Sequence, residues 1–95
     1  MEYGLSSKVI DNIKDIVNKY PKYKFVIFGS RAKGNFSETS DIDIAIFENV
    51  SEVDKFHIMD DFDKLDIIYK IDIVFISNDT KKELLESINK NNIKL

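Results

Sequence analysis

Residues 29–43 read GSRAKGNFSETSDID and separate two short apolar runs. The run before them, KFVIF, is typical of a buried strand, and Gly29 ends it. The run after them alternates, so that its isoleucines lie on one face and Asp41 and Asp43 lie on the other. The stretch therefore predicts a strand, a short helical turn, a polar loop and a second strand.

The rest of the chain alternates between helical and strand patterns. We expect a helix over roughly 6–19, begun by Ser6 or Ser7, and a helix over about 52–65, begun by Ser51. The second helix is expected to bury Val53, Phe56, Met59 and Phe62. A strand over 67–76, a last helix opened by a Thr80–Glu83 capping box and a short strand over 93–95 complete the order. This order predicts one α/β or α+β domain over 1–95, a small mixed sheet with helices mainly on one face.

Composition limits the classes of protein that remain. The chain has 95 residues and a net charge of −3, with no cysteine, which excludes disulfides and thiolate metal sites and fits a cytoplasmic protein. No apolar run exceeds four residues, whereas a membrane helix needs about 20, so we expect no membrane contact. Residues 36–79 hold 12 acidic and 3 basic side chains, which argues against a broad nucleic-acid surface.

Three aspartates in two predicted strands form the first candidate site. Asp41 and Asp43 share a face by the strand period, and Asp72 interrupts a later apolar run, IDIVF. If the two strands are neighbours, the three carboxylates converge, and oxygen ligands without His or Cys favour Mg²⁺ or Mn²⁺ over zinc. Two such ions can stabilise the attacking and leaving oxygens of an in-line displacement. The competing interpretation is that Asp41 and Asp43 only form the solvent-exposed face of an edge strand.

The turn after the first strand forms the second candidate site. Gly29 permits a close backbone approach to a phosphate, and Ser30 adds a hydroxyl. Arg31 and Lys33 add positive charge, and Arg31 is notable because it is the only arginine in a chain with 13 lysines. A Gly-Ser pair after a strand is usually only a turn. The interpretation as a phosphate site therefore depends on the spacing between this pair and the aspartates.

The combined pattern of Gly29-Ser30, ten residues, and Asp41-Ile42-Asp43 resembles the signature of the DNA polymerase beta-like nucleotidyltransferase superfamily. Asp72 stands where that family places its third acid. The resemblance runs over essentially the whole chain, and its length and the segments GSRAKG and SDIDIAIF are similar to the minimal nucleotidyltransferase (MNT) group.

The resemblance implies specific roles. Gly29 and Ser30 would bind the β- and γ-phosphates of ATP, and Asp41 and Asp43 would bind Mg²⁺, two ions in all, with Mn²⁺ as a substitute. Asp72 would complete the metal site and help to deprotonate the attacking hydroxyl. Arg31 and Lys33 would lie near the phosphates, or Arg31 would face the acceptor; the sequence leaves this open.

The resemblance also implies a partner. In the MNT group that partner is a small helical HEPN-type protein, an RNA-cutting toxin, and the MNT chain is the antitoxin that transfers AMP from ATP onto a toxin tyrosine. Two alternatives remain open: a catalytic subunit for a small-molecule acceptor, and a non-catalytic module that only masks its partner.

Overall fold

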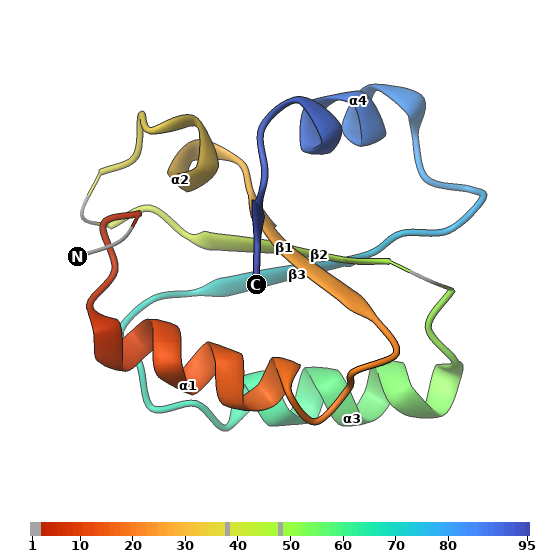
Figure 1. Ribbon diagram of the computed structural model, residues 1–95, viewed down its shortest axis with the longest axis horizontal. Helices are drawn as coiled ribbons and strands as arrows, with labels where there is room; N and C mark the ends of the chain where they lie inside the picture. The colour runs from red at the N-terminus through yellow and green to blue at the C-terminus, as the bar shows by residue number, and fades with distance from the viewer. Residues whose placement is uncertain (1–2, 38, 48) are drawn as a thin grey trace.

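The computed structural model describes residues 3–37, 39–47 and 49–95. Its elements follow the expected order (Figure 1). They are α1 (Ser7–Val17), β1 (Lys24–Phe28), α2 (Ser30–Lys33), β2 (Ile42–Phe47), α3 (Glu52–Asp63), β3 (Ile71–Phe75), α4 (Lys82–Lys90) and β4 (Ile93–Lys94). Within these described ranges, no helix is long and apolar enough to cross a membrane.

The four strands form one mixed sheet in the order β3-β2-β1-β4. β1 pairs antiparallel with both β2 and β4, while β2 and β3 run parallel. A parallel pair needs a crossover connection, and α3 supplies it. The predicted mixed sheet and its helix–strand order are confirmed.

Helices cover the two faces of the sheet unequally. α1 and α3 lie together on one face, and α4 lies on the other (Figure 1). The larger core cluster joins α1 and α3 to the isoleucines of β2, whereas the smaller cluster joins Ile88 of α4 to Val26 and Ala45. The helices therefore lie mainly on one face, as expected, and α4 covers part of the opposite face, where the predicted aspartates also point.

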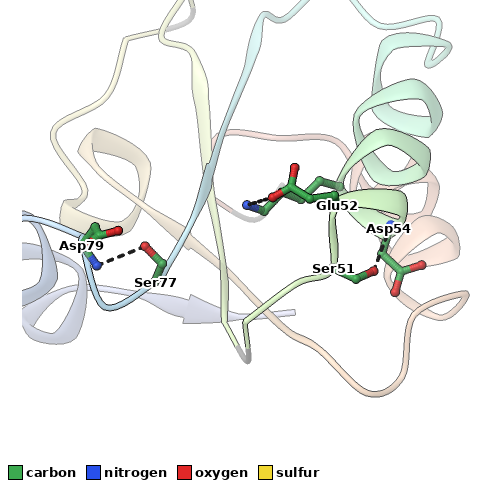
Figure 2. A network of polar contacts seen from close by, with 6 residues as sticks. Ser51, Glu52, Asp54, Ser77 and Asp79 are labelled. Carbon is green, nitrogen blue, oxygen red and sulfur yellow. Dashed lines mark hydrogen bonds and ion pairs between the residues drawn. The ribbon is translucent and has the colours of Figure 1, made fainter.

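Short polar contacts set the ends of the helices. Ser6 accepts a hydrogen bond from the backbone N–H of Val9, as predicted for an N-cap. Ser51 likewise accepts one from the backbone N–H of Asp54 (Figure 2). The predicted Thr80–Glu83 capping box is wrong. α4 begins two residues after Thr80 with no side-chain cap, because the Thr80 hydroxyl accepts the backbone N–H of Ser77 instead.

The predicted buried face of α3 is wrong for three of its four residues, whereas Phe62 is buried as expected. Val53, Phe56 and Met59 are 66%, 70% and 48% exposed, and the helix buries Ile58 and Phe62. Steps of three residues turn a helix by 300°, so such a row drifts by about 60° at each step and does not stay on one face. Burial follows the four-residue step from Ile58 to Phe62 instead.

Polar contacts complete the packing of α3 against the segment before β1. The Tyr20 hydroxyl donates to Asp61 at 2.6 Å, and the Tyr23 hydroxyl donates to Asp54. Because two aspartates occupy the inner side of α3, its apolar pattern alone did not indicate which side is buried. The strand predicted over 67–76 is shorter than expected, since β3 begins at Ile71 and Ile68 is 93% exposed.

Candidate active site

The parallel pairing of β2 and β3 brings two of the predicted acids together. Asp43 of β2 lies opposite Asp72 of β3, and on its other side Asp43 lies opposite Phe28, the last residue of β1. Paired residues on neighbouring strands, about 5 Å apart, point to the same face of a sheet. Both carboxylates therefore lie on the α4 face, at the end of β1 that leads into α2.

Asp41 stands at the rim of this pair. It is exposed and precedes β2 by one residue. The pKa of the half-buried Asp43 is raised above its ordinary value, first by burial and then by the negative charges of Asp72 and Asp41. The negative charges of Asp72 and Asp41 are therefore close enough to repel that of Asp43.

The described side chains provide little positive charge to balance this repulsion. Lys70 lies 3.6 Å from Asp72, but the lysine is largely exposed and the aspartate partly so, so the pair contributes little. A divalent cation would neutralise facing carboxylates more effectively, and an all-oxygen donor set suits Mg²⁺ or Mn²⁺.

The acids do not form a complete metal cage. In the part of the chain that the structure describes, no three acidic or histidine side chains are arranged to hold a metal ion by themselves. Asp43 and Asp72 face each other, and Asp41 approaches from the rim. This arrangement fits an ion that takes its other ligands from water and from a bound phosphate, which is the usual coordination of Mg²⁺.

Gly29 packs directly against this acidic pair. A Cβ atom at position 29 would lie 2.3 Å from Oδ2 of Asp43. The backbone of Gly29 has φ 75° and ψ −151°, a conformation that is essentially restricted to glycine. The Asp43 carboxylate therefore occupies the space that any side chain at position 29 would need, and the turn after β1 touches the acid site.

Ser30 and Lys33 follow in the short helix α2. Ser30 is half-buried at the start of the helix, and its carbonyl accepts the backbone N–H groups of Gly34 and Asn35. Lys33 is exposed. Ser30 thus adjoins the Gly29–Asp43 contact, and Lys33 lies exposed at the end of the same short helix.

Arg31 is placed differently from the position expected for it. Its side chain is 2% exposed, so the guanidinium does not face solvent or an open phosphate site. It donates to the backbone carbonyls of Tyr3, at 2.9 Å, and Ser40, at 2.7 Å. In this structure both ends of the guanidinium are bonded to backbone, so the side chain supports the scaffold, while its contact with a phosphate or an acceptor stays a prediction.

The partners of Arg31 were not recognised from the sequence. Its guanidinium carbon lies 4.8 Å from the ring centre of Tyr69 and 5.3 Å from that of Phe36. No motif in the sequence singles out Tyr69 or Phe36 as a neighbour of Arg31. The single arginine among many lysines was the available signal, and it indicated a special position without indicating its neighbours.

A hollow of about 390 Å³ elsewhere on the surface holds none of the predicted acids. It is bounded by α3 and β3, and Met59, Phe62 and Ile73 are among its lining residues. The hollow has the shape of a binding site, but the facing carboxylates of Asp43 and Asp72 lie on the other face of the sheet. We therefore place the candidate site at the carboxylates.

Comparisons with known proteins agree with the fold and with the family suggested by the sequence. The model of the family described as "Polymerase beta, Nucleotidyltransferase" matches residues 11–95. No curated protein matches the chain. Among solved structures, the crystal structure of a Sulfolobus solfataricus protein with a nucleotidyltransferase assignment is similar, at a TM-score of 0.53 and 22% identity, covering 88% of this chain and 72% of that one.

Proposed function

The chain belongs to the polymerase beta nucleotidyltransferase family, and we propose from this that it is a Mg²⁺-dependent adenylyltransferase that transfers AMP from ATP to a protein. The proposed acceptor is a tyrosine of a HEPN-type toxin, which makes the chain an antitoxin. The observation that carries the proposal is the pairing of Asp43 with Asp72 beside Gly29.

In the proposed reaction the tyrosine oxygen attacks the α-phosphorus of ATP, the bond to the β-phosphate breaks, and pyrophosphate leaves. Asp41, Asp43 and Asp72 would hold Mg²⁺, which when bound supplies the positive charge that stabilises the attacking and leaving oxygens. Asp72 would accept the proton of the attacking hydroxyl.

The turn after β1 would hold the other end of the nucleotide. Gly29 brings its backbone against Asp43, so a phosphate bound over this turn would lie next to the acids. Ser30 would donate its hydroxyl to that phosphate, and the exposed Lys33 would add positive charge. The acids and the turn would thus bind the two parts of one metal–triphosphate group.

Transfer onto the toxin has a physical consequence that suits an antitoxin. An adenylate group is bulky and negatively charged. Placed beside the active site of an RNA-cutting protein, it would obstruct RNA by its size and by repulsion between like charges. One covalent event would then inactivate the toxin without permanent occupancy by the antitoxin.

The proposal predicts that a neighbouring gene encodes a small helical protein with an R-x4-H-like segment and a nearby tyrosine, and the direct test uses that protein. The two proteins are incubated with isotope-labelled ATP and Mg²⁺, and the products are read by mass spectrometry. The expected result is AMP on a tyrosine of the neighbour and free pyrophosphate. If no residue of the neighbouring protein gains the mass of AMP, the proposed acceptor is wrong.

Variants separate catalysis from masking. The double variant Asp41→Asn with Asp43→Asn should lower the rate of AMP transfer by orders of magnitude, while the protein still binds the neighbouring protein. Asp11→Asn with Asp15→Asn changes the charge equally on the exposed side of α1 and should transfer AMP normally. If the Asp41/Asp43 variant protects cells from the toxin as well as the wild type does, neutralisation occurs by masking and the enzymatic role is wrong.

Nucleotide binding gives a second, acceptor-free test. The acid cluster should repel a triphosphate unless a cation intervenes, so calorimetry should find much weaker ATP binding in EDTA than in Mg²⁺. Equal affinity under the two conditions would contradict the metal-dependent site.

A further inference from the structure

Arg31 is the only charged side chain that is buried in the described residues. Burying a guanidinium is costly unless it is paired, yet no described ion pair includes it. Its Nε atom has no hydrogen-bond partner in the described structure. An apolar side chain would fill this position without the cost of burying a charge. We therefore expect the guanidinium to have a role other than packing.

The contacts of Arg31 join the segments that lead into the candidate site. Its own helix begins directly after Gly29. One nitrogen donates to the carbonyl of Ser40, the residue before Asp41. The Tyr69 ring, three residues before Asp72, lies against the guanidinium plane, where cation–π attraction holds it. One side chain therefore contacts the approach to each of the two acid-bearing strands.

Asp41 is the acid that most needs such support. Asp43 and Asp72 lie within β2 and β3, where ladder hydrogen bonds fix the backbone. Asp41 lies outside β2, at the end of a polar loop, and its side chain is exposed. Ser40, immediately before it, bonds to Ser37 within the same loop, and the bond from Arg31 to the Ser40 carbonyl ties that loop to α2.

We propose that Arg31 is a positioning residue: its guanidinium fixes Ser40 and Tyr69 and so keeps Asp41 at the rim of the Asp43–Asp72 pair, where its carboxylate adds to the binding of a cation that takes its other ligands from water and phosphate. This proposal rests on the metal site of the proposed function. It assigns Arg31 no contact with ATP, which separates it from the role expected from the sequence.

A lysine cannot replace this arrangement. The guanidinium is planar and donates in two directions at once while its faces contact the rings, whereas an ammonium is a compact charge at one point. Arg31→Lys should therefore keep the positive charge but lose one of the two carbonyl bonds and the ring contacts. Arg31→Met removes both bonds and the charge.

The test measures Mn²⁺ binding to the protein alone by electron paramagnetic resonance, in wild-type and Asp41→Asn backgrounds. In the wild-type background, Arg31→Lys should weaken Mn²⁺ binding about tenfold, the loss typical of residues that orient metal ligands. In the Asp41→Asn background it should cause little further loss, because the ligand that Arg31 positions is already absent. Circular dichroism checks that each variant is folded.

Two further variants keep the test decisive. Lys14→Met, on the exposed side of α1, removes one positive charge far from the described contacts of Arg31 and should not weaken Mn²⁺ binding. If the Arg31 variants fail to fold, Tyr69→Leu is measured instead, because it removes one ring contact of Arg31. It should weaken Mn²⁺ binding less than Arg31→Lys does, and should cause little further loss in the Asp41→Asn background.

The outcomes distinguish this proposal from its premise. Wild-type protein that binds no Mn²⁺, with or without ATP, would contradict the metal site itself. Wild-type binding with no loss in Arg31→Lys would contradict only the positioning role. An equal loss in both backgrounds would show that Arg31 supports the fold in general and not Asp41.

Discussion

Asp43 and Asp72 face each other across the parallel pair β2–β3, and Gly29 lies against the Asp43 carboxylate from the turn after β1. Two like charges and one obligatory glycine thus meet at a single place on the sheet. Each of these relationships has a measurable effect on stability.

The raised pKa of Asp43 predicts that replacing this acid with a neutral residue stabilises the fold by an amount that depends on pH. An acid whose pKa is higher in the folded state stabilises the fold when protonated, and this contribution is lost as pH rises through the raised pKa. Asp43→Asn stays neutral, so without metal it should exceed the wild type in stability by up to about 1 kcal/mol at about pH 7 and by almost nothing near pH 4.

The measurement for Asp43 is urea unfolding in EDTA at the two pH values, with Asp11→Asn on the exposed side of α1 as the control. The gain should be absent in the control. A gain for Asp43→Asn that is equal at both pH values would show that burial and charge repulsion are not its cause.

Gly29→Ala should be far more costly than Gly34→Ala. Both glycines have positive φ, but a Cβ at Gly34 meets nothing within 4 Å, whereas one at Gly29 meets the Asp43 carboxylate. We expect a loss of about 1–2 kcal/mol at Gly34 from backbone strain alone. At Gly29 we expect about 2–4 kcal/mol, since strain and overpacking combine.

Chemical denaturation measures both glycine variants, and a double variant isolates the contact. Adding Asp43→Ala should recover part of the loss caused by Gly29→Ala, because it vacates the space that the new Cβ needs. If the loss is the same with and without the Asp43 side chain, the contact is not what restricts position 29.

The corrected face of α3 predicts opposite outcomes for two neighbouring apolar residues. Ile58 is fully buried, so Ile58→Ala should cost about 2–5 kcal/mol. Phe56 is 70% exposed, so Phe56→Ser should stay within about 0.5 kcal/mol of the wild type. Thermal unfolding of the two variants compares them directly, and a larger loss at Phe56 would restore the face first predicted from the sequence.

The hydrogen bond from Tyr20 to Asp61 predicts an alkaline transition. Burial, then the bond to Asp61 and its charge, raise the pKa of Tyr20 to about 12. The folded state thus favours the protonated phenol, so this contribution is complete below about pH 10 and is lost as pH rises through about 12.

Tyr20→Phe removes the hydroxyl and should cost about 1 kcal/mol at neutral pH. Titration of tyrosine absorbance should show one group with the raised pKa, which is absent in Tyr20→Phe and returns toward the ordinary value in Asp61→Ala. A titration that Asp61→Ala leaves unchanged would contradict the assigned cause.

The sequence predicted the elements that depend on local pattern. Period-two alternation placed Asp41 and Asp43 on one side of a strand, and the order of elements predicted a mixed sheet in which Asp72 could meet them. The structure pairs Asp72 with Asp43, although it leaves Asp41 at the rim. Local alternation fixes the face of a strand, but the closeness of separate strands depends on register.

The features that the sequence did not reveal depend on contacts between distant segments. Arg31 is buried because Tyr3, Phe36 and Tyr69 come from three other places in the chain. The inner side of α3 carries Asp54 and Asp61, which are tolerated there because tyrosines outside the helix bond to them. Neither pairing leaves a periodic signal in the residues themselves.

The crossover through α3 has a consequence for the route by which the chain folds. β1 and β2 form an antiparallel pair, whereas β2 and β3 can pair only after α3 has closed the crossover between them. Asp72 therefore meets Asp43 when β3 docks, and we expect their repulsion to slow that step. A divalent cation would relieve it, so the rate at which the edge strand closes, and the hydrogen exchange of its amides, should depend on the cation concentration around the protein.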